Sequence, residues 1–208
     1  MSVQISLSVL SADQLHFEES IAPILPHVDR VHYDVMDGHL VDNIALGLPL
    51  LEQWHCPKPI DAHLMISNPE RFLERFAHYC ESVYIHWEAH EEKTIPLLET
   101  IRTYGKSAGI TINPATPPEV LLPYLSDISH VLIMSVVPGF GGQHCMTETF
   151  DKISLLKQQK PELIITVDGG ITDVTAPLAR EKGADILVSG SFLVKASTIQ
   201  ESVASLRG

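Results

Sequence analysis

Short apolar segments alternate with longer amphipathic segments along the whole chain, and this alternation constrains the fold more than any other feature. The apolar segments predict strands because they are rich in β-branched residues and are bounded by turn residues. The expected strands lie at residues 3–10, 30–35, 59–65, 82–86, 107–112, 130–134, 163–167 and 184–188. The expected helices lie at residues 12–26, 48–54, 67–79, 91–104, 147–159, 172–182 and 191–206, with a turn and helix start at 113–119.

Strands that alternate with helices form a parallel sheet. Eight such units fit into 208 residues, and no linker or low-complexity segment divides them. A (β/α)8 TIM barrel has this number of units, and ~200 residues is the compact end of its length range. The sequence therefore predicts an α/β protein with one barrel domain over residues 1–208. A doubly wound open sheet is the alternative.

Charge argues against two classes of partner. The formal net charge is −12, and the acidic residues are scattered along the chain. A protein of this charge is a poor match for nucleic acid or for an anionic membrane surface. A small anion remains possible, because backbone amides and helix N-termini can bind phosphate without basic side chains.

The cysteines and the N-terminal residues indicate the cellular compartment in which the protein is expected. Cys56, Cys80 and Cys145 are odd in number, far apart and outside any CxxC motif, which indicates reduced thiols in a cytoplasmic protein. The first residues lack the charged and apolar regions of a signal peptide, and no apolar run is long enough to span a bilayer.

Residues 31–39 carry the first candidate for chemistry. His32, Asp34 and Met36 lie two residues apart in an expected strand, so they share one face, with His32 and Asp34 roughly 6–7 Å apart along it. A histidine and a carboxylate side by side could hold Zn, Fe(II), Mn or Co. The alternative is a buried polar pair that is hydrogen-bonded to itself.

Other expected strands also end in polar residues. Ser8 ends the first strand, His63 lies in the third, and Asp168 ends the seventh. Catalytic residues of these barrels lie at the C-terminal ends of the strands, which meet at one mouth. The sequence therefore predicts that His32, Asp34, His63 and Asp168 converge on one divalent metal.

Three glycine-containing loops predict an anion site. The first holds Gly139, Phe140, Gly141 and Gly142, and the others hold Gly169-Gly170 and Gly190-Ser191. Glycine lets backbone N–H groups approach an anion closely, and barrels commonly bind phosphate in the loops after strands seven and eight. Ordinary β/α turns are the alternative.

Several motifs together resemble the ribulose-phosphate 3-epimerase family, over nearly the whole chain. The matching segments are Ser8-Val9-Leu10-Ser11-Ala12-Asp13, His32-Tyr33-Asp34-Val35-Met36-Asp37-Gly38-His39, Asp61-Ala62-His63-Leu64-Met65, Asn113-Pro114-Ala115-Thr116-Pro117, Met134-Ser135, Pro138-Gly139-Phe140-Gly141-Gly142-Gln143 and Val167-Asp168-Gly169-Gly170-Ile171. The resemblance implies a barrel that interconverts D-ribulose 5-phosphate and D-xylulose 5-phosphate. It also implies a homo-oligomer, either a dimer or a hexamer.

The resemblance also assigns roles to residues. By position, His32, Asp34, His63 and Asp168 match metal ligands, and Asp34 and Asp168 match the two acid–base carboxylates. The implied substrate contacts are Ser8, His63, Gly139, Phe140, Gly141, Gly142, Gly169, Gly170, Gly190 and Ser191. These residue types suit the chemistry, because inverting a carbon beside a ketone needs a proton acceptor on each face and a cation that stabilises the enediolate.

The chain departs from the family at five positions, and these bear on sugar specificity. They are Leu7, Asp42, Ala45, Leu46 and Val137. None removes a ligand or a carboxylate, so a rival is an epimerase acting on a ketohexose 6-phosphate such as allulose 6-phosphate. A non-catalytic sugar-phosphate-binding relative is a further alternative. Barrel decarboxylases and hexulose-phosphate synthases carry Asp-x-Lys-x-x-Asp, whereas residues 34–37 contain no lysine.

One more motif stands outside this set of roles. His86, Glu88 and His90 alternate and could suggest a second metal site. The resemblance implies a His-x-Glu at this place that is not used as a metal site.

Overall fold

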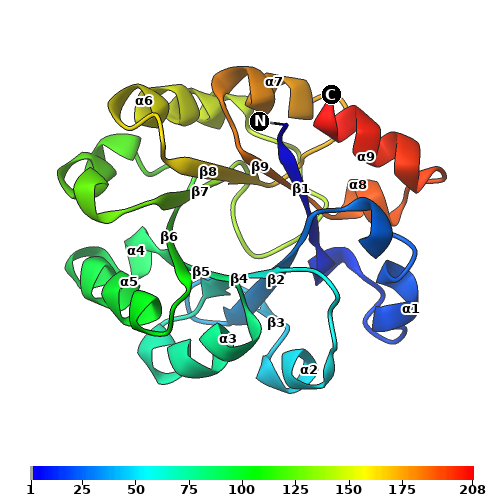
Figure 1. The fold of residues 1–208 in the computed structure, drawn as a ribbon, viewed down its shortest axis with the longest axis horizontal. Coiled ribbons are helices and arrows are strands. Elements are labelled where there is room, and N and C mark those ends of the chain that lie inside the picture. Colours follow the sequence, from blue (N-terminus) through cyan, green and yellow to red (C-terminus); the bar gives the residue numbers. More distant parts are fainter. Residues whose placement is uncertain (1) are drawn as a thin grey trace.

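Eight strands pair in parallel around a closed barrel in the computed structural model, which describes residues 2–208 (Figure 1). They are β1 (Gln4–Ser8), β2 (Arg30–Asp37), β4 (Ile60–Met65), β5 (Ser82–His86), β6 (Ser107–Ile112), β7 (His130–Met134), β8 (Ile164–Asp168) and β9 (Ile186–Ser189). β1 pairs with both β2 and β9, and this double pairing closes the sheet. The predicted TIM barrel is confirmed, and the doubly wound open sheet is wrong.

The helices surround the strands (Figure 1). They are α1 (Phe17–Ile21), α2 (Leu48–Gln53), α3 (Leu73–Tyr79), α4 (Trp87–His90), α5 (Thr94–Thr103), α6 (Asp151–Gln159), α7 (Ala176–Lys182), α8 (Ser191–Val194) and α9 (Ile199–Arg207). Short 3-10 helices lie at η1 (Val9–Ser11), η2 (Leu25–His27), η3 (Pro69–Arg71), η4 (Glu91–Lys93), η5 (Pro118–Asp127) and η6 (Thr147–Phe150). Strands covered on both faces are largely buried, and every residue of β4 is buried, including the polar Asp61 and His63.

Buried apolar side chains form one large core layer and two smaller clusters, one of which contains Met36, Val41 and Met65. The larger layer lies between the strands and the helices and includes Ile5, Val31 and Leu187. A smaller cluster of Tyr84, Leu132, Met134 and Val136 is separate from it. The Tyr84 hydroxyl lies 3.1 Å from the Thr166 hydroxyl, so it links β5 to β8, which are not neighbours in the sheet.

Two helical regions differ clearly from the prediction, one at residues 12–26 and one after the turn at residues 113–119. The single helix expected over residues 12–26 is wrong, because only Phe17–Ile21 and the 3-10 turn η2 are helical there. Pro23 and Pro26 lie in this stretch and cannot donate the backbone hydrogen bonds of a continuous α-helix. The helix start expected at 113–119 leads into η5, a 3-10 helix with Pro123 inside it.

The expected loop over residues 37–47 contains a strand. β3 (Ile44–Ala45) pairs antiparallel with the end of β2, with Ala45 opposite Met36. Two residues are too few to produce a recognisable periodicity in sequence. The pairing extends β2 as far as Asp37 and brings this loop beside the C-terminal ends of the strands.

Within residues 2–208, no helix combines the length and the apolar character that crossing a membrane would need.

Candidate active site

β2 places His32 and Asp34 on one buried face, as the alternation of strand side chains predicted. Nε2 of His32 lies 3.4 Å from Oδ1 of Asp34. The same nitrogen lies 3.7 Å from Oδ2 of Asp168, at the end of β8. Residues from two separate strands therefore meet around the His32 ring.

His63 joins this group because β4 pairs beside β2 with His63 opposite Asp34. Nδ1 of His63 lies within hydrogen-bond distance, 3.0 Å, of Oδ1 of Asp34. The Ser8 hydroxyl, at the end of β1, donates a hydrogen bond of 2.8 Å to Oδ2 of the same carboxylate. The hydrogen bond from Ser8 fixes one oxygen of Asp34 before any ligand binds, and the role of His63 toward the other oxygen depends on its tautomer.

Four side chains form a cluster that fits a divalent metal. One ligand atom from each of His32, Asp34, His63 and Asp168 lies within 4.8 Å of all the others. The His32 ring is fully buried, yet neither of its nitrogens has a hydrogen-bond partner among residues 2–208. A buried polar group without a partner is unfavourable, and binding of a cation would satisfy one nitrogen. Two imidazoles and two carboxylates suit Zn, Fe(II), Mn or Co.

The pKa values of the two carboxylates are pushed in opposite directions. Burial alone would raise the pKa of Asp34, but His32 and His63 outweigh burial and hold it well below its ordinary value. Burial, reinforced by the charge of Asp34, raises the pKa of Asp168 despite the nearby His32. Two carboxyl groups tuned apart in this way are typical of an acid–base pair.

The pKa values of the two histidines are also shifted in opposite directions. Burial would lower the pKa of His32, but the negative charges of Asp34 and Asp168 outweigh it and raise that pKa to about 9. Burial lowers the pKa of His63 to about 3, against the opposing effect of Asp34. In the metal-free protein, His32 therefore carries the positive charge of the cluster and His63 is neutral.

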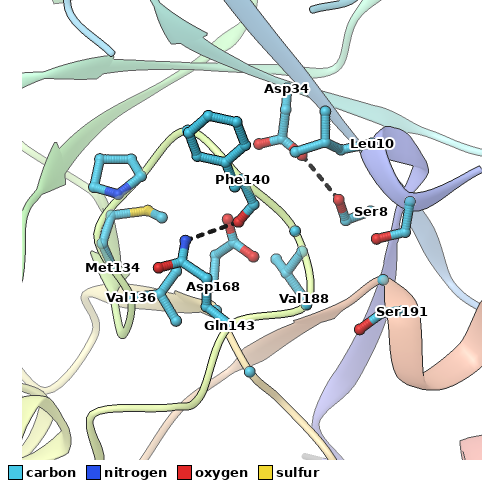
Figure 2. A pocket seen from close by; sticks show the side chains of 18 of the residues that line it. Ser8, Leu10, Asp34, Met134, Val136, Phe140, Gln143, Asp168, Val188 and Ser191 are labelled. Atoms are coloured by element: carbon cyan, nitrogen blue, oxygen red, sulfur yellow. Dashed lines mark hydrogen bonds between the residues drawn. The ribbon is translucent and has the colours of Figure 1, made fainter. Parts of the chain in front are cut away.

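A cavity of about 250 Å³ opens at the mouth of the barrel, and Asp34 and Asp168 both point into it (Figure 2). The predicted site residues that line it are Ser8, Asp34, Gly139, Phe140, Gly141, Gly142, Asp168, Gly169, Gly170, Gly190 and Ser191. His63 was predicted to contact substrate, but it is fully buried and does not line the cavity. Met36, Met65 and Met134 supply part of the apolar wall.

Four further polar residues line the cavity, to which the sequence analysis assigned no role, although Ser11 and Gln143 lie in segments that match the family. They are Ser11, Gln143, His144 and Thr172. Ser11 lies close to Gly190, since a Cβ built on that glycine would come 2.7 Å from the Ser11 hydroxyl oxygen. Its place one short 3-10 turn after Ser8 is the signal that could have identified it. No Lys or Arg is among the residues of 2–208 that line the cavity, so backbone N–H groups of the glycine loops are the main candidate donors to an anion there.

The five departures from the family pattern do not reach the cavity wall formed by residues 2–208. Leu7 is fully buried in the larger core layer. Ala45 packs against the cluster that contains Met36 and Met65. Val137 is 57% exposed, although its neighbours Val136 and Pro138 line the cavity.

Solved structures of other barrels superpose on the whole chain. A 3-hexulose-6-phosphate synthase gives a TM-score of 0.68 at 17% identity, covering 100% of this chain and 98% of its own. KGPDC from Streptococcus mutans gives 0.74 at 12% identity, covering 99% and 96%. At these identities the likeness shows the fold alone.

Sequence relatives are much closer. The chain is 38% identical to the ribulose-phosphate 3-epimerase of Bacillus subtilis (strain 168), with 99% of each chain covered. It is 33% identical to that of Helicobacter pylori (strain ATCC 700392 / 26695), with 99% of this chain and 97% of the relative covered. The model of the ribulose-phosphate 3 epimerase family matches residues 4–194. With its barrel, its His and Asp cluster and these full-length relatives, the chain belongs to the ribulose-phosphate 3-epimerase family.

Proposed function

We propose that the protein is a metal-dependent epimerase that inverts C3 of a ketose phosphate, interconverting D-ribulose 5-phosphate and D-xylulose 5-phosphate. The observation that carries this proposal is the pair of carboxylates, Asp34 and Asp168, which enter one cavity from separate strands with oppositely shifted pKa values. Epimerisation needs two groups of this kind, one to remove a proton and one to return a proton to the opposite face.

His32, Asp34, His63 and Asp168 would hold one divalent cation, either Zn, Fe(II), Mn or Co. Such a cation supplies positive charge that stabilises the enediolate formed when C3 loses its proton. His32, Asp34 and His63 are almost fully buried, and Met36, Met65 and Met134 line the cavity with Asp34 and Asp168, so electrostatic interactions at the cluster are screened less than they would be in water.

Asp34 and Asp168 perform the proton transfers. The ionised carboxylate accepts the C3 proton, leaving a planar enediolate, and the other group, which starts as the protonated acid, delivers its proton from the opposite side, so each turnover exchanges the two protonation states. The hydrogen bond from Ser8 keeps Asp34 facing the cavity during both steps. The methionine side chains beside the carboxylates are soft, apolar and adaptable, so they can follow the change from tetrahedral to planar carbon.

The substrate phosphate binds at the glycine side of the cavity. Backbone N–H groups of Gly141, Gly142, Gly170, Gly190 and Ser191 are the candidate donors, since all five residues line the cavity. Backbone donors suit this role because the cavity wall offers no Lys or Arg among residues 2–208. We extend the proposal to the whole chain as one catalytic domain that acts in the cytoplasm as a homo-oligomer.

Epimerisation of D-ribulose 5-phosphate, with metal content measured on the same sample, tests the reaction and the cofactor together. Allulose 6-phosphate is the comparison substrate, and faster turnover of that hexose would replace the pentose in the proposal. A metal-loaded protein that turns over neither sugar would contradict the enzymatic function.

Asparagine variants test the two-base mechanism in deuterated solvent. Asp34→Asn and Asp168→Asn each remove one proton acceptor but keep an oxygen of similar position. Each metal-loaded variant is expected to exchange the C3 hydrogen of one epimer without inverting it, and the two variants should prefer opposite epimers. Inversion at near the wild-type rate by either metal-loaded variant would falsify the two-base mechanism.

A further inference from the structure

His86 and Glu88 have no role in the proposed reaction, yet they are directly connected to a metal-ligand residue. His86 ends β5 and is fully buried. Its Nε2 lies 2.9 Å from Nε2 of His63, and the two ring planes are 22° apart. One nitrogen therefore carries the proton and donates it to the other across this contact.

Glu88 occupies the other end of the His86 ring. Its Oε2 lies 3.3 Å from Nδ1 of His86. Its Oε1 accepts hydrogen bonds from the backbone N–H of Asn113, at 2.7 Å, and from the Thr116 hydroxyl. Burial opposes ionisation of Glu88, but these hydrogen bonds outweigh it and hold the pKa of Glu88 below its ordinary value. Glu88 is thus a fixed carboxylate.

Lys152 stabilises the loop that holds Glu88. Its ammonium group donates to the carbonyl oxygens of Asn113, Pro114 and Thr116 at 2.8, 2.8 and 2.7 Å. The Asn-Pro-Ala-Thr segment therefore acts as a clamp for the Glu88 carboxylate. This clamp fixes one end of a chain of hydrogen bonds that runs through His86 to His63.

The positions of the protons along this chain follow from its fixed end. An ionised carboxylate only accepts, so Nδ1 of His86 carries a proton and its Nε2 carries a lone pair. Nε2 of His63 must then carry the proton that this lone pair accepts. A neutral imidazole has one N–H, so Nδ1 of His63 presents its lone pair toward Oδ1 of Asp34, 3.0 Å away. Two acceptors at that distance repel each other unless a cation binds both.

We propose that Glu88 and His86 are positioning residues that set the tautomer of His63, so that its Nδ1 presents a lone pair for the metal. The inference rests on the metal site of the proposed function. Outer partners that fix the tautomer of a histidine ligand typically change metal affinity ~10–100-fold when they are removed.

Variants of His86 test the inference through metal affinity, measured by competition with a chelator. His86→Phe keeps a flat ring but removes the acceptor for His63, so the dissociation constant is expected to rise about 10–100-fold. His86→Gln places an amide oxygen near the original Nε2 and should restore most of the affinity. His130→Phe is the matched control, because His130 begins β7 at the other end of the barrel and should leave the affinity unchanged.

Two further measurements separate positioning from a structural role. Glu88→Gln can donate to His86 Nδ1 as well as accept, so it should weaken metal binding while the melting temperature of the metal-free protein changes little. Long-range ¹H–¹⁵N spectra of the metal-free protein should show the Nε2–H tautomer of His63 in the wild type and the Nδ1–H tautomer in His86→Phe.

The possible failures are distinguishable. A wild-type protein that binds no divalent metal contradicts the metal site of the proposed function, and the spectra of His63 still decide whether Glu88 and His86 set its tautomer. Unchanged affinity in both His86→Phe and Glu88→Gln, or an Nδ1–H tautomer of His63 in the wild type, overturns the positioning role.

Discussion

At the scale of single residues, His32 is a fully buried titratable group that lies close to two carboxylates. Its nitrogens have no hydrogen-bond partner within residues 2–208. The same two carboxylates that raise its pKa are the groups with which it would share a metal. A proton and a divalent cation therefore compete for one position.

This competition predicts the pH dependence of metal binding. Because the pKa of His32 is raised to about 9 in the metal-free protein, a metal that binds below that pH must displace its proton. The dissociation constant should therefore rise about tenfold for each pH unit lowered below 9, and more steeply once Asp168 also gains a proton. Chelator competition between pH 7 and 8.5 measures this slope. Affinity that stays constant over this range would show that His32 does not bind the metal.

Gly190 tests the phosphate site without touching the cluster. A Cβ at this position would lie 2.7 Å from the Ser11 hydroxyl oxygen and 3.3 Å from Ser8. Gly190→Val should fill space needed by the anion and raise KM for the sugar phosphate more than tenfold, with metal content unchanged. Gly47→Ala is the control, since its nearest contact, with Pro49, is an ordinary 3.4 Å. An unchanged KM for the sugar phosphate in Gly190→Val, measured by steady-state kinetics, would show that the phosphate does not bind beside Gly190.

At the scale of elements, a buried ion pair ties three strands together at the end of the barrel opposite the cavity. Arg30 at the start of β2 donates from Nε and Nη2 to the two oxygens of Asp61 in β4, at 2.8 and 2.5 Å. It also donates to the Ser82 hydroxyl in β5 at 3.2 Å. Asp61 is 1% exposed, so the pair is shielded from water and its carboxylate depends on Arg30.

Removing one partner of this pair should weaken the fold strongly. Arg30→Met leaves the Asp61 carboxylate buried without its ionic partner, which typically costs about 3–5 kcal/mol of unfolding free energy. The matched control is Arg75→Met, because Arg75 pairs with Glu52 at the surface and is 53% exposed, so the loss should be under about 1 kcal/mol. Urea denaturation of both variants makes the comparison. Equal losses would mean that burial of the Arg30 pair does not matter.

At the scale of the whole molecule, the barrel closes through its own strand pairing. β1 completes the sheet between β2 and β9, and a large apolar core packs the strands against the helices. The metal ligands come from the ends or middles of strands that are already paired. The fold is therefore expected to persist without metal, while the bound cation adds stability through binding to the folded state only.

Removal of metal with a chelator should lower the melting temperature without unfolding the protein. At a free metal concentration ~100 times the dissociation constant, binding adds about 2.7 kcal/mol. For a chain of this length that corresponds to a shift of about 5–10 °C. Calorimetry with chelator, and after metal is restored, measures the difference. Unfolding at room temperature on chelation would instead show that the metal is required for the barrel to form.

The barrel, and many of the residues that line its cavity, were predictable from local signals in the sequence. Strand positions were predictable because β-branched residues, alternation and flanking turns are local signals, and five neighbouring residues suffice to read them. Three predicted strands, at residues 82–86, 107–112 and 130–134, match β5, β6 and β7 at both ends. Asp34, Asp168 and the cavity glycines were predictable because parallel strands deliver their C-terminal ends to one mouth.

Other features of the site depend on contacts between segments that lie far apart in the chain. Whether Leu7 and Val137 face the cavity depends on the twist of the strands and the conformation of the loops. Neither residue is part of the cavity wall that residues 2–208 form. The contact between His63 and His86 depends on the pairing of β4 beside β5, and the support of Glu88 depends on a loop 25 residues further along the chain. A sequence pattern shows which side chains are present and on which strand. The proton that His63 carries is set by neighbours that only the closed barrel brings within hydrogen-bond distance.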